Sequence, residues 1–174
     1  TFSSRGLGDV YKRQTYGDGL FGGGLSFCDF DGDGWDDLTF CSENSEQLYI
    51  YRNHYGSFEQ VELAGIDVTS ESKQPIWVDY DNDGDKDLFV TSFLAQNRLY
   101  NNDGNFNFTD VTVIAGIPLA SMPTFGATFG DIDKDGDLDL YVTNRSGTGF
   151  SFTNYLYEND EGVFVDITAS AGVA

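Results

Sequence analysis

Short apolar runs alternate with polar, glycine-containing turns along most of the chain. Apolar runs of this length, bounded by turn residues, predict β-strands, and no helical periodicity of useful length competes with them. A set of four such runs occurs three times. The predicted strands are, in chain order, 25–27, 38–41, 47–51 and 58–63, then 75–78, 88–91, 98–101 and 106–111, and finally 125–129, 140–143, 155–158 and 163–167.

Other positions recur with the strands. An aromatic residue precedes the first turn of each set, a Leu-Tyr pair opens the third strand, and an Ala-Gly pair closes the set. These residues are Phe27, Trp77 and Phe129, Leu48-Tyr49, Leu99-Tyr100 and Leu156-Tyr157, and Ala64-Gly65, Ala115-Gly116 and Ala171-Gly172. Four short strands in a period of 50 to 52 residues are typical of a propeller blade. We therefore predict an all-β protein of about three four-stranded antiparallel β-propeller blades. Its repeats are expected at about 22–69, 70–121 and 122–174, within a domain of residues 15–174.

An acidic loop joins the first two strands of every repeat. It reads D-F-D-G-D-G-W-D-D-L at 29–38, D-Y-D-N-D-G-D-K-D-L at 79–88 and D-I-D-K-D-G-D-L-D-L at 131–140. Closely spaced carboxylates repel one another unless a cation binds them. Ca²⁺ takes six to eight oxygen ligands, and a glycine at position 6 allows the sharp turn around it. The loops therefore predict three Ca²⁺ sites.

Alternating positions of each loop are expected to converge on the ion. We assign side-chain oxygens to positions 1, 3, 5 and 9 and a backbone carbonyl to position 7. The side-chain ligands are Asp29, Asp31, Asp33 and Asp37, then Asp79, Asp81, Asp83 and Asp87, and finally Asp131, Asp133, Asp135 and Asp139. The carbonyl ligands are Trp35, Asp85 and Asp137.

Three other interpretations fit the loops less well than a calcium site does: an EF-hand, a set of turn caps and a site for a different metal. An EF-hand needs a bidentate Glu at position 12 and flanking helices, but this position holds Phe40, Val90 and Val142, and strands flank the loops. Simple turn capping does not explain three copies of four carboxylates. Mg²⁺ demands strict octahedral geometry, and zinc prefers His and Cys ligands.

The net charge of the chain disfavours some classes of binding partner. The formal net charge is −20, which argues against nucleic acid and anionic membrane surfaces. Fifteen of the 29 acidic residues lie in the three loops, so three bound Ca²⁺ would reduce the charge to about −14. No apolar run is long enough to span a membrane, and no signal peptide is evident.

Two segments stand apart from the repeats. Residues 1–14 hold three of the nine basic residues and resemble translated adapter sequence, so we treat them as a non-native leader; an ordinary basic tail is the alternative. Cys28 and Cys41 flank only the first loop. We expect them on adjacent strands but out of register, which favours two buried thiols over a disulfide.

The repeats resemble FG-GAP or VCBS repeats, the calcium-binding blades of integrin alpha-type propellers. The sequences of residues 97–106 (N-x-L-Y-x-N-x-G-x-F) and 108–117 (F-x-D-V-T-x-x-A-G-I) are most similar to those of bacterial proteins of the cartilage acidic protein (ASPIC/UnbV) family. The resemblance implies an extracellular, cell-surface or periplasmic setting. Propellers of this family usually have about seven blades. We therefore expect the chain to be an internal piece of a longer protein, with the missing blades as neighbours.

The expected function is non-catalytic: a calcium-binding module for adhesion or for recognition of an extracellular protein or glycan. A calcium-dependent polysaccharide lyase and a pure spacer are the alternatives. The single histidine, His54, has no counterpart in the other repeats and is expected to be solvated, so no Ser-His-Asp set can be assembled. If this piece contacts a partner, the insertion 144–154, with Arg145, Phe150 and Phe152, is the first place to look.

Overall fold

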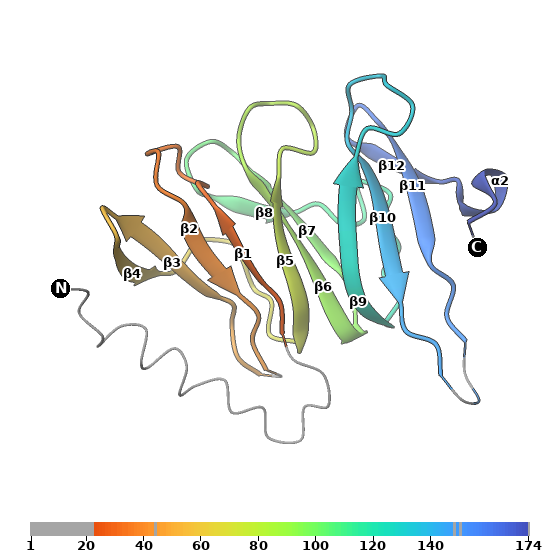
Figure 1. Ribbon diagram of the computed structural model, residues 1–174, viewed down its shortest axis with the longest axis horizontal. Helices are drawn as coiled ribbons and strands as arrows, with labels where there is room; N and C mark the ends of the chain where they lie inside the picture. The colour runs from red at the N-terminus through yellow and green to blue at the C-terminus, as the bar shows by residue number, and fades with distance from the viewer. Residues whose placement is uncertain (1–22, 44, 148, 150, 174) are drawn as a thin grey trace.

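The computed structural model describes residues 23–43, 45–147, 149 and 151–173 (Figure 1). The predicted leader, 1–14, and Phe150 lie outside the described residues. Blade 1 consists of β1 (Leu25–Cys28), β2 (Asp37–Phe40), β3 (Tyr49–His54) and β4 (Ser57–Val61). Blade 2 consists of β5 (Ser72–Val78), β6 (Asp87–Ala95), β7 (Arg98–Asn102) and β8 (Phe108–Asp110). Blade 3 consists of β9 (Met122–Gly130), β10 (Asp139–Asn144), β11 (Tyr155–Asp160) and β12 (Val163–Asp166).

Each blade is an antiparallel sheet in which neighbouring strands follow one another along the chain. The three blades stand side by side, and the acidic loops all lie along one edge, at the top in Figure 1. The insertion after β10 lies at the opposite edge. The all-β fold built from propeller blades is thus confirmed; the boundaries of the repeats stay a prediction.

Blades 2 and 3 are also joined through the backbone. The end of β6 runs past its own blade and pairs with the start of β9, with Phe93 opposite Pro123 and Ala95 opposite Met122. This pairing explains why β6 and β9 are longer than the strands expected from their apolar runs. At the same edge, the Gly24 N–H donates to the Lys73 carbonyl and connects blade 1 to blade 2.

The hydrophobic core lies between neighbouring blades. One cluster fills the space between blades 1 and 2, and its buried members are Phe30, Leu48, Ile50, Val68, Leu88, Val90, Tyr100 and Phe108. The other lies between blades 2 and 3, with Val78, Tyr80, Phe89, Leu99, Ala115, Ile117, Leu140, Val142, Tyr157 and Phe164. Alternation along β6 sends Leu88 and Val90 into the first cluster and Phe89 into the second. A central blade is therefore buried on both faces.

The Ala-Gly motifs connect one blade to the next. The Ala64 carbonyl accepts the Phe108 N–H at 2.8 Å, and the Ala115 carbonyl accepts the Phe164 N–H at the same distance. The third copy ends a short helix, α2 (Thr168–Ala171), which the strand pattern does not predict. Gly172 closes this helix in the left-handed conformation that glycine adopts without steric cost.

The two cysteines are free thiols. Cys28 pairs with Asp37 across the β1–β2 hairpin, and the Cys41 N–H donates to Gly24, four residues before Cys28. The two residues are therefore out of register, as expected, with Cys41 directly after β2. The expectation of two buried thiols holds for Cys41, whereas Cys28 is only half-buried. Burial raises the pKa of Cys41 to about 11, so this thiol is a packed core group at neutral pH.

Candidate metal centres

The three acidic loops, here called site 1 (29–37), site 2 (79–87) and site 3 (131–139), fold through their own side chains. The position-5 carboxylate accepts the N–H of position 7 in each loop, at 2.8 Å in site 1 (Asp33 to Trp35) and 2.9 Å in the other two. The glycine at position 6 has a positive φ of 89° to 103° in all three. The backbone conformation therefore requires a glycine at position 6, because other residues rarely adopt a positive φ.

The aspartate at position 9 ties each loop to the strands behind it. In site 2, one oxygen of Asp87 accepts the N–H of Tyr80 at 3.2 Å, and the other accepts the N–H of Asn102 on β7 at 2.8 Å. Asp37 and Asp139 make the same pair of contacts in their blades. All three carboxyl groups are buried, so they hold the loop against the blade.

An asparagine on the third strand completes this connection. Asn159 donates its amide to the Leu138 carbonyl and accepts the N–H of Gly162, and it also donates to the Tyr80 carbonyl of blade 2 at 2.8 Å. Asn53 and Asn102 hold the matching loop carbonyl and turn of their own blades. We call Asn53, Asn102 and Asn159 the clamp asparagines.

The structure brings three carboxylates of each loop together, with one oxygen from each within 4.8 Å of the others. These groups are Asp29, Asp31 and Asp33; Asp79, Asp81 and Asp87; and Asp131, Asp133 and Asp139. The predicted side-chain ligands outside these groups are Asp37, Asp83 and Asp135. The carbonyl ligands Trp35, Asp85 and Asp137 stay a prediction.

Site 2 fits a divalent cation best. Asp79 and Asp81 each have one oxygen held by the protein, by the Gly84 N–H and the Asn101 amide. Their second oxygens, both Oδ1, are closed off from solvent and have no hydrogen-bond partner among the described residues. Buried carboxylate oxygens without a partner are costly, and a hard cation is the ligand that satisfies them.

The pKa shifts at site 2 also fit a site for a divalent cation. Burial raises the pKa of Asp87 to about 7, although the N–H groups of Asn102 and Tyr80 act in the opposite direction. Burial and the neighbouring Asp83 also raise the pKa of Asp81. A bound cation reverses such shifts, because it favours the charged carboxylates.

The two aspartates at position 7, Asp85 and Asp137, contact groups outside the carboxylate clusters. Asp137 accepts the Asn82 amide at 2.7 Å and the Glu161 N–H at 2.9 Å, so it links site 3 to the loop of site 2 and to its own β11–β12 turn. Asp85 lies against Gly104 in the β7–β8 turn. Both side chains therefore support the loops from outside.

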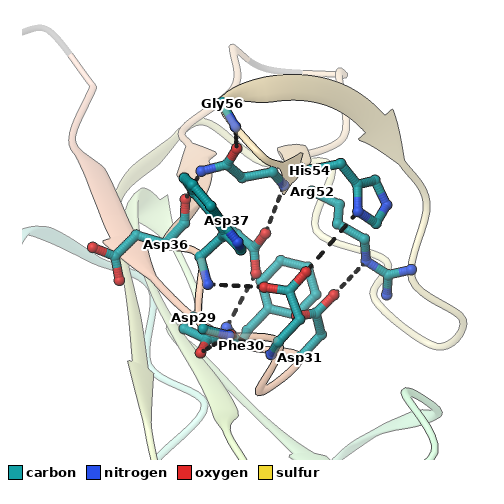
Figure 2. Close-up of polar contacts among 12 residues, drawn as sticks. Asp29, Phe30, Asp31, Asp36, Asp37, Arg52, His54 and Gly56 are labelled. Carbon is teal, nitrogen blue, oxygen red and sulfur yellow. Dashed lines mark hydrogen bonds and ion pairs between the residues drawn. The ribbon is translucent and has the colours of Figure 1, made fainter.

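Site 1 differs from the others by two basic side chains. Arg52 on β3 forms an ion pair with Asp31, with 2.7 Å between Nε and Oδ2 (Figure 2). The Nε–H does not point at this oxygen well enough to be a hydrogen bond, so the contact is an ion pair by distance. His54 lies at the exposed rim, 4.0 Å from Asp33. Its exposure agrees with the expectation that it is solvated.

Sequence reasoning missed Arg52 as a neighbour of site 1 and missed the role of the clamp asparagines. A signal for the latter was present, because each lies two residues after a tyrosine of the third strand, as Tyr51-x-Asn53, Tyr100-x-Asn102 and Tyr157-x-Asn159. In the first repeat the equivalent tyrosine is Tyr51, and not Tyr49 of the expected Leu-Tyr pair, because Tyr51 pairs with Leu38 as Tyr100 pairs with Leu88. Arg52 has no such signal, since the matching positions hold Asn101 and Glu158. Its contact with Asp31 depends on how the loop folds back onto β3.

Comparison with known proteins supports the repeat assignment. The family of FG-GAP-like repeats matches residues 29–90 and 79–142, which span more than half of the chain and include all three acidic loops. The chain is also similar to human (Homo sapiens) Cartilage acidic protein 1, with 25% identity over 175 residues. This alignment covers 86% of the chain and 26% of the human protein, so the chain spans about a quarter of that relative. The recurrent loops, the blade topology and these matches agree: the chain belongs to the FG-GAP-like repeat family.

Proposed function

We propose that this chain is a non-catalytic, calcium-stabilised propeller module of an extracellular or cell-surface protein. The observation that carries the proposal is the pair of partnerless, solvent-inaccessible oxygens on Asp79 and Asp81 beside the buried Asp87. The described part of the protein supplies no group for these oxygens, and a calcium ion would supply one. Repetition of the loop in all three blades supports the same role for sites 1 and 3.

Calcium would act here as part of the fold. An extracellular-type site with a dissociation constant of about 0.1 mM adds roughly 1.4 kcal/mol of stability at millimolar calcium. Three such sites add about 4 kcal/mol, a large share of the stability of an ordinary domain. The module would then be firmly folded outside the cell and weakened at the submicromolar calcium inside it.

The direct test compares thermal unfolding in chelator and in calcium. We expect the melting temperature of the whole chain to rise by several degrees or more with calcium, and calorimetry to count three ions. Asp81→Asn removes the negative charge and one of the two oxygens of this side chain and should lower both the ion count and the calcium-dependent shift. Asp85→Asn is the matched control, because this side chain lies against Gly104, away from the carboxylate group.

A melting temperature that is the same in chelator and in calcium would reject the proposal. Equal effects of Asp81→Asn and Asp85→Asn would show that the loop responds only to its total charge.

The location and partner extend this proposal. Similarity to Cartilage acidic protein 1 and the affinity range of such sites support an extracellular or surface setting. Among the described residues, no helix is long and apolar enough to cross a membrane.

We propose recognition of an extracellular protein or glycan, with the insertion 144–154 as the contact, because it projects from the edge opposite the acidic loops (Figure 1). Screening the calcium-loaded chain against immobilised glycans and matrix proteins tests this; a partner that binds equally well after the insertion is shortened would exclude the insertion.

A further inference from the structure

We infer that the three sites are not equivalent and that site 1 binds calcium most weakly, because Arg52 already acts as its cation. This inference rests on the proposed calcium function and concerns how that function is distributed among the blades. It assigns Arg52 as the residue that sets the affinity of site 1.

The comparison between blades isolates one position. Arg52, Asn101 and Glu158 each directly precede a clamp asparagine, and each occupies the same place in the pairing of the third and fourth strands, opposite Glu59, Thr109 and Val165. In blades 1 and 2 this position touches the loop aspartate at position 3. Arg52 lies 2.7 Å from Asp31, and the Asn101 amide donates to Asp81 at 2.9 Å. The charge at this position is therefore positive in blade 1, neutral in blade 2 and negative in blade 3.

Arg52 is held in place by more than the ion pair. Its guanidinium lies over the ring of Phe30, 6.0 Å from the centroid, and over the ring of Phe106 in blade 2, at 5.5 Å. Phe30 is position 2 of the same loop and is buried. Cation–π contacts on two rings stabilise the guanidinium beside the loop, so an incoming ion meets a positioned positive charge.

The carboxylates of site 1 are correspondingly satisfied without an ion. Asp29 accepts the N–H groups of Asp33 and Gly34 at 3.0 and 2.8 Å. Asp31 accepts the Asp33 N–H at 3.2 Å and pairs with Arg52 (Figure 2). Site 2, with a neutral asparagine in the same place, keeps two oxygens that have no partner in the described part of the chain. The free energy gained by adding a cation is therefore smaller at site 1.

The size of the effect follows from Coulomb's law. A unit charge about 5 Å from a divalent ion changes its binding by roughly tenfold or more at the dielectric constant of water, and by more in a partly buried site. We therefore expect the dissociation constant of site 1 to exceed that of site 2 by about tenfold or more. As calcium falls, site 1 should empty first while its loop stays held by Arg52.

The chain contains its own reporter for site 1. Trp35 is position 7 of this loop, and the residue is 41% exposed. Tb³⁺ replaces Ca²⁺ at oxygen sites and emits when a tryptophan close to it is excited. Titrating calcium into the Tb³⁺-loaded chain and following the emission measures site 1, while calorimetry with calcium measures all sites. The chain has one other tryptophan, Trp77, so the part of the signal lost in Trp35→Phe identifies site 1.

The decisive variants change the charge at the position of Arg52 and at the equivalent position, Asn101. Arg52→Gln should tighten the Trp35-dependent site about tenfold, whereas Arg52→Lys keeps the charge and should leave it weak. The reciprocal change, Asn101→Arg, should weaken one of the tighter sites seen by calorimetry by a similar factor. If Arg52→Gln folds poorly because the ring contacts are lost, Arg52→Lys and Asn101→Arg still test the inference.

The outcomes separate the inference from the proposed function. A Trp35-dependent site that fills together with the other two, or one unchanged in Arg52→Gln, overturns the inference and leaves the calcium function standing. The same holds if Asn101→Arg does not weaken calcium binding. A flat calorimetric titration of the unmodified chain would reject the calcium function, and the inference with it.

Discussion

The Asp87 carboxyl group is completely buried, and its two oxygens accept the backbone N–H groups of Tyr80 and Asn102. Burial opposes its ionisation, whereas calcium binding requires it. In the proposed calcium-bound state, Asp87 would contact both the blade behind it and the ion in front of it. The pH dependence of the melting temperature should therefore differ between the ion-free and the ion-bound protein.

Burial raises the pKa of Asp87 to about 7, so the ion-free folded state binds a proton more tightly than the unfolded state does. The stability from this group is complete below the unfolded pKa of about 4 and is lost as the pH rises through about 7. Calcium binds the ionised form and offsets the loss. We therefore predict that the difference in melting temperature between calcium-saturated and chelated samples grows from about pH 5 to about pH 8.

Replacing Asp87 by Asn should flatten this pH dependence, because the titrating group is gone. Asp103→Asn is the control: hydrogen bonds from Asn107 and Asn105 lower the pKa of Asp103, so it titrates below the tested range. A calcium effect independent of pH in the unmodified chain would contradict the prediction.

At the scale of the element, every blade closes its acidic hairpin with the same side-chain device. The position-9 aspartate and the clamp asparagine together connect the loop, the third strand and the turn after it. In blade 3 the device also reaches blade 2, because Asn159 donates to the Tyr80 carbonyl. The strength of the element therefore depends on a buried carboxylate and a buried amide group together.

Asn159→Ala should lower the free energy of unfolding by about 2–4 kcal/mol, since it leaves buried carbonyl and N–H groups without partners. Asn53→Ala is the matched variant, because Asn53 holds its own loop and turn but its described bonds do not cross to another blade. We expect it to cost less. Chemical denaturation in calcium measures both, and equal losses would show that the Tyr80 contact contributes nothing.

Most strands were predictable because their apolar runs alternate with turns that glycine and asparagine mark locally. All twelve predicted strands are present, with ends shifted by a few residues. The larger differences have tertiary causes. β6 and β9 extend because they pair with each other at Phe93 and Pro123, and α2 forms where Gly172 ends a single helical turn.

At the scale of the whole molecule, the blades are held by apolar clusters and by the Ala-Gly motifs. Gly65 packs against the Phe108 carbonyl of blade 2, and Gly116 packs against the Phe164 carbonyl of blade 3. Both glycines have positive φ, 90° and 81°. The same motif in blade 3 ends at Gly172, where an added Cβ would meet no other described residue within 4 Å.

Gly116→Ala should lower the free energy of unfolding by about 2–4 kcal/mol, combining the cost of a positive φ with a collision against the Phe164 carbonyl. Gly172→Ala has the same type of backbone, with a φ of 72°, but meets no neighbour among the described residues, so it should cost only about 1 kcal/mol. The difference between the two denaturation curves measures the packing between blades. Equal costs would show that the motif is needed for its conformation alone.

Neighbouring blades also explain why equivalent residues differ in burial. Trp77 stacks on Phe30 of blade 1 with 4.7 Å between ring centroids, and its indole N–H donates to Thr39. Phe27, at the same place in the first repeat, is 59% exposed. Position in the repeat sets the residue type, but the adjacent blade decides whether the side chain is buried.

The blade type, the three blades and the acidic loops follow from local sequence patterns, namely the strand alternation, the D-G turn and the repeat. Tertiary packing selected the three carboxylates of each loop that converge. It also placed Arg52 on Asp31 and the Ala-Gly motifs on the next blade. These contacts join residues far apart along the chain, such as Asn159 and Tyr80, and depend on how one blade packs against another. Local pattern therefore specifies each blade, and packing between blades specifies how the blades and their sites differ.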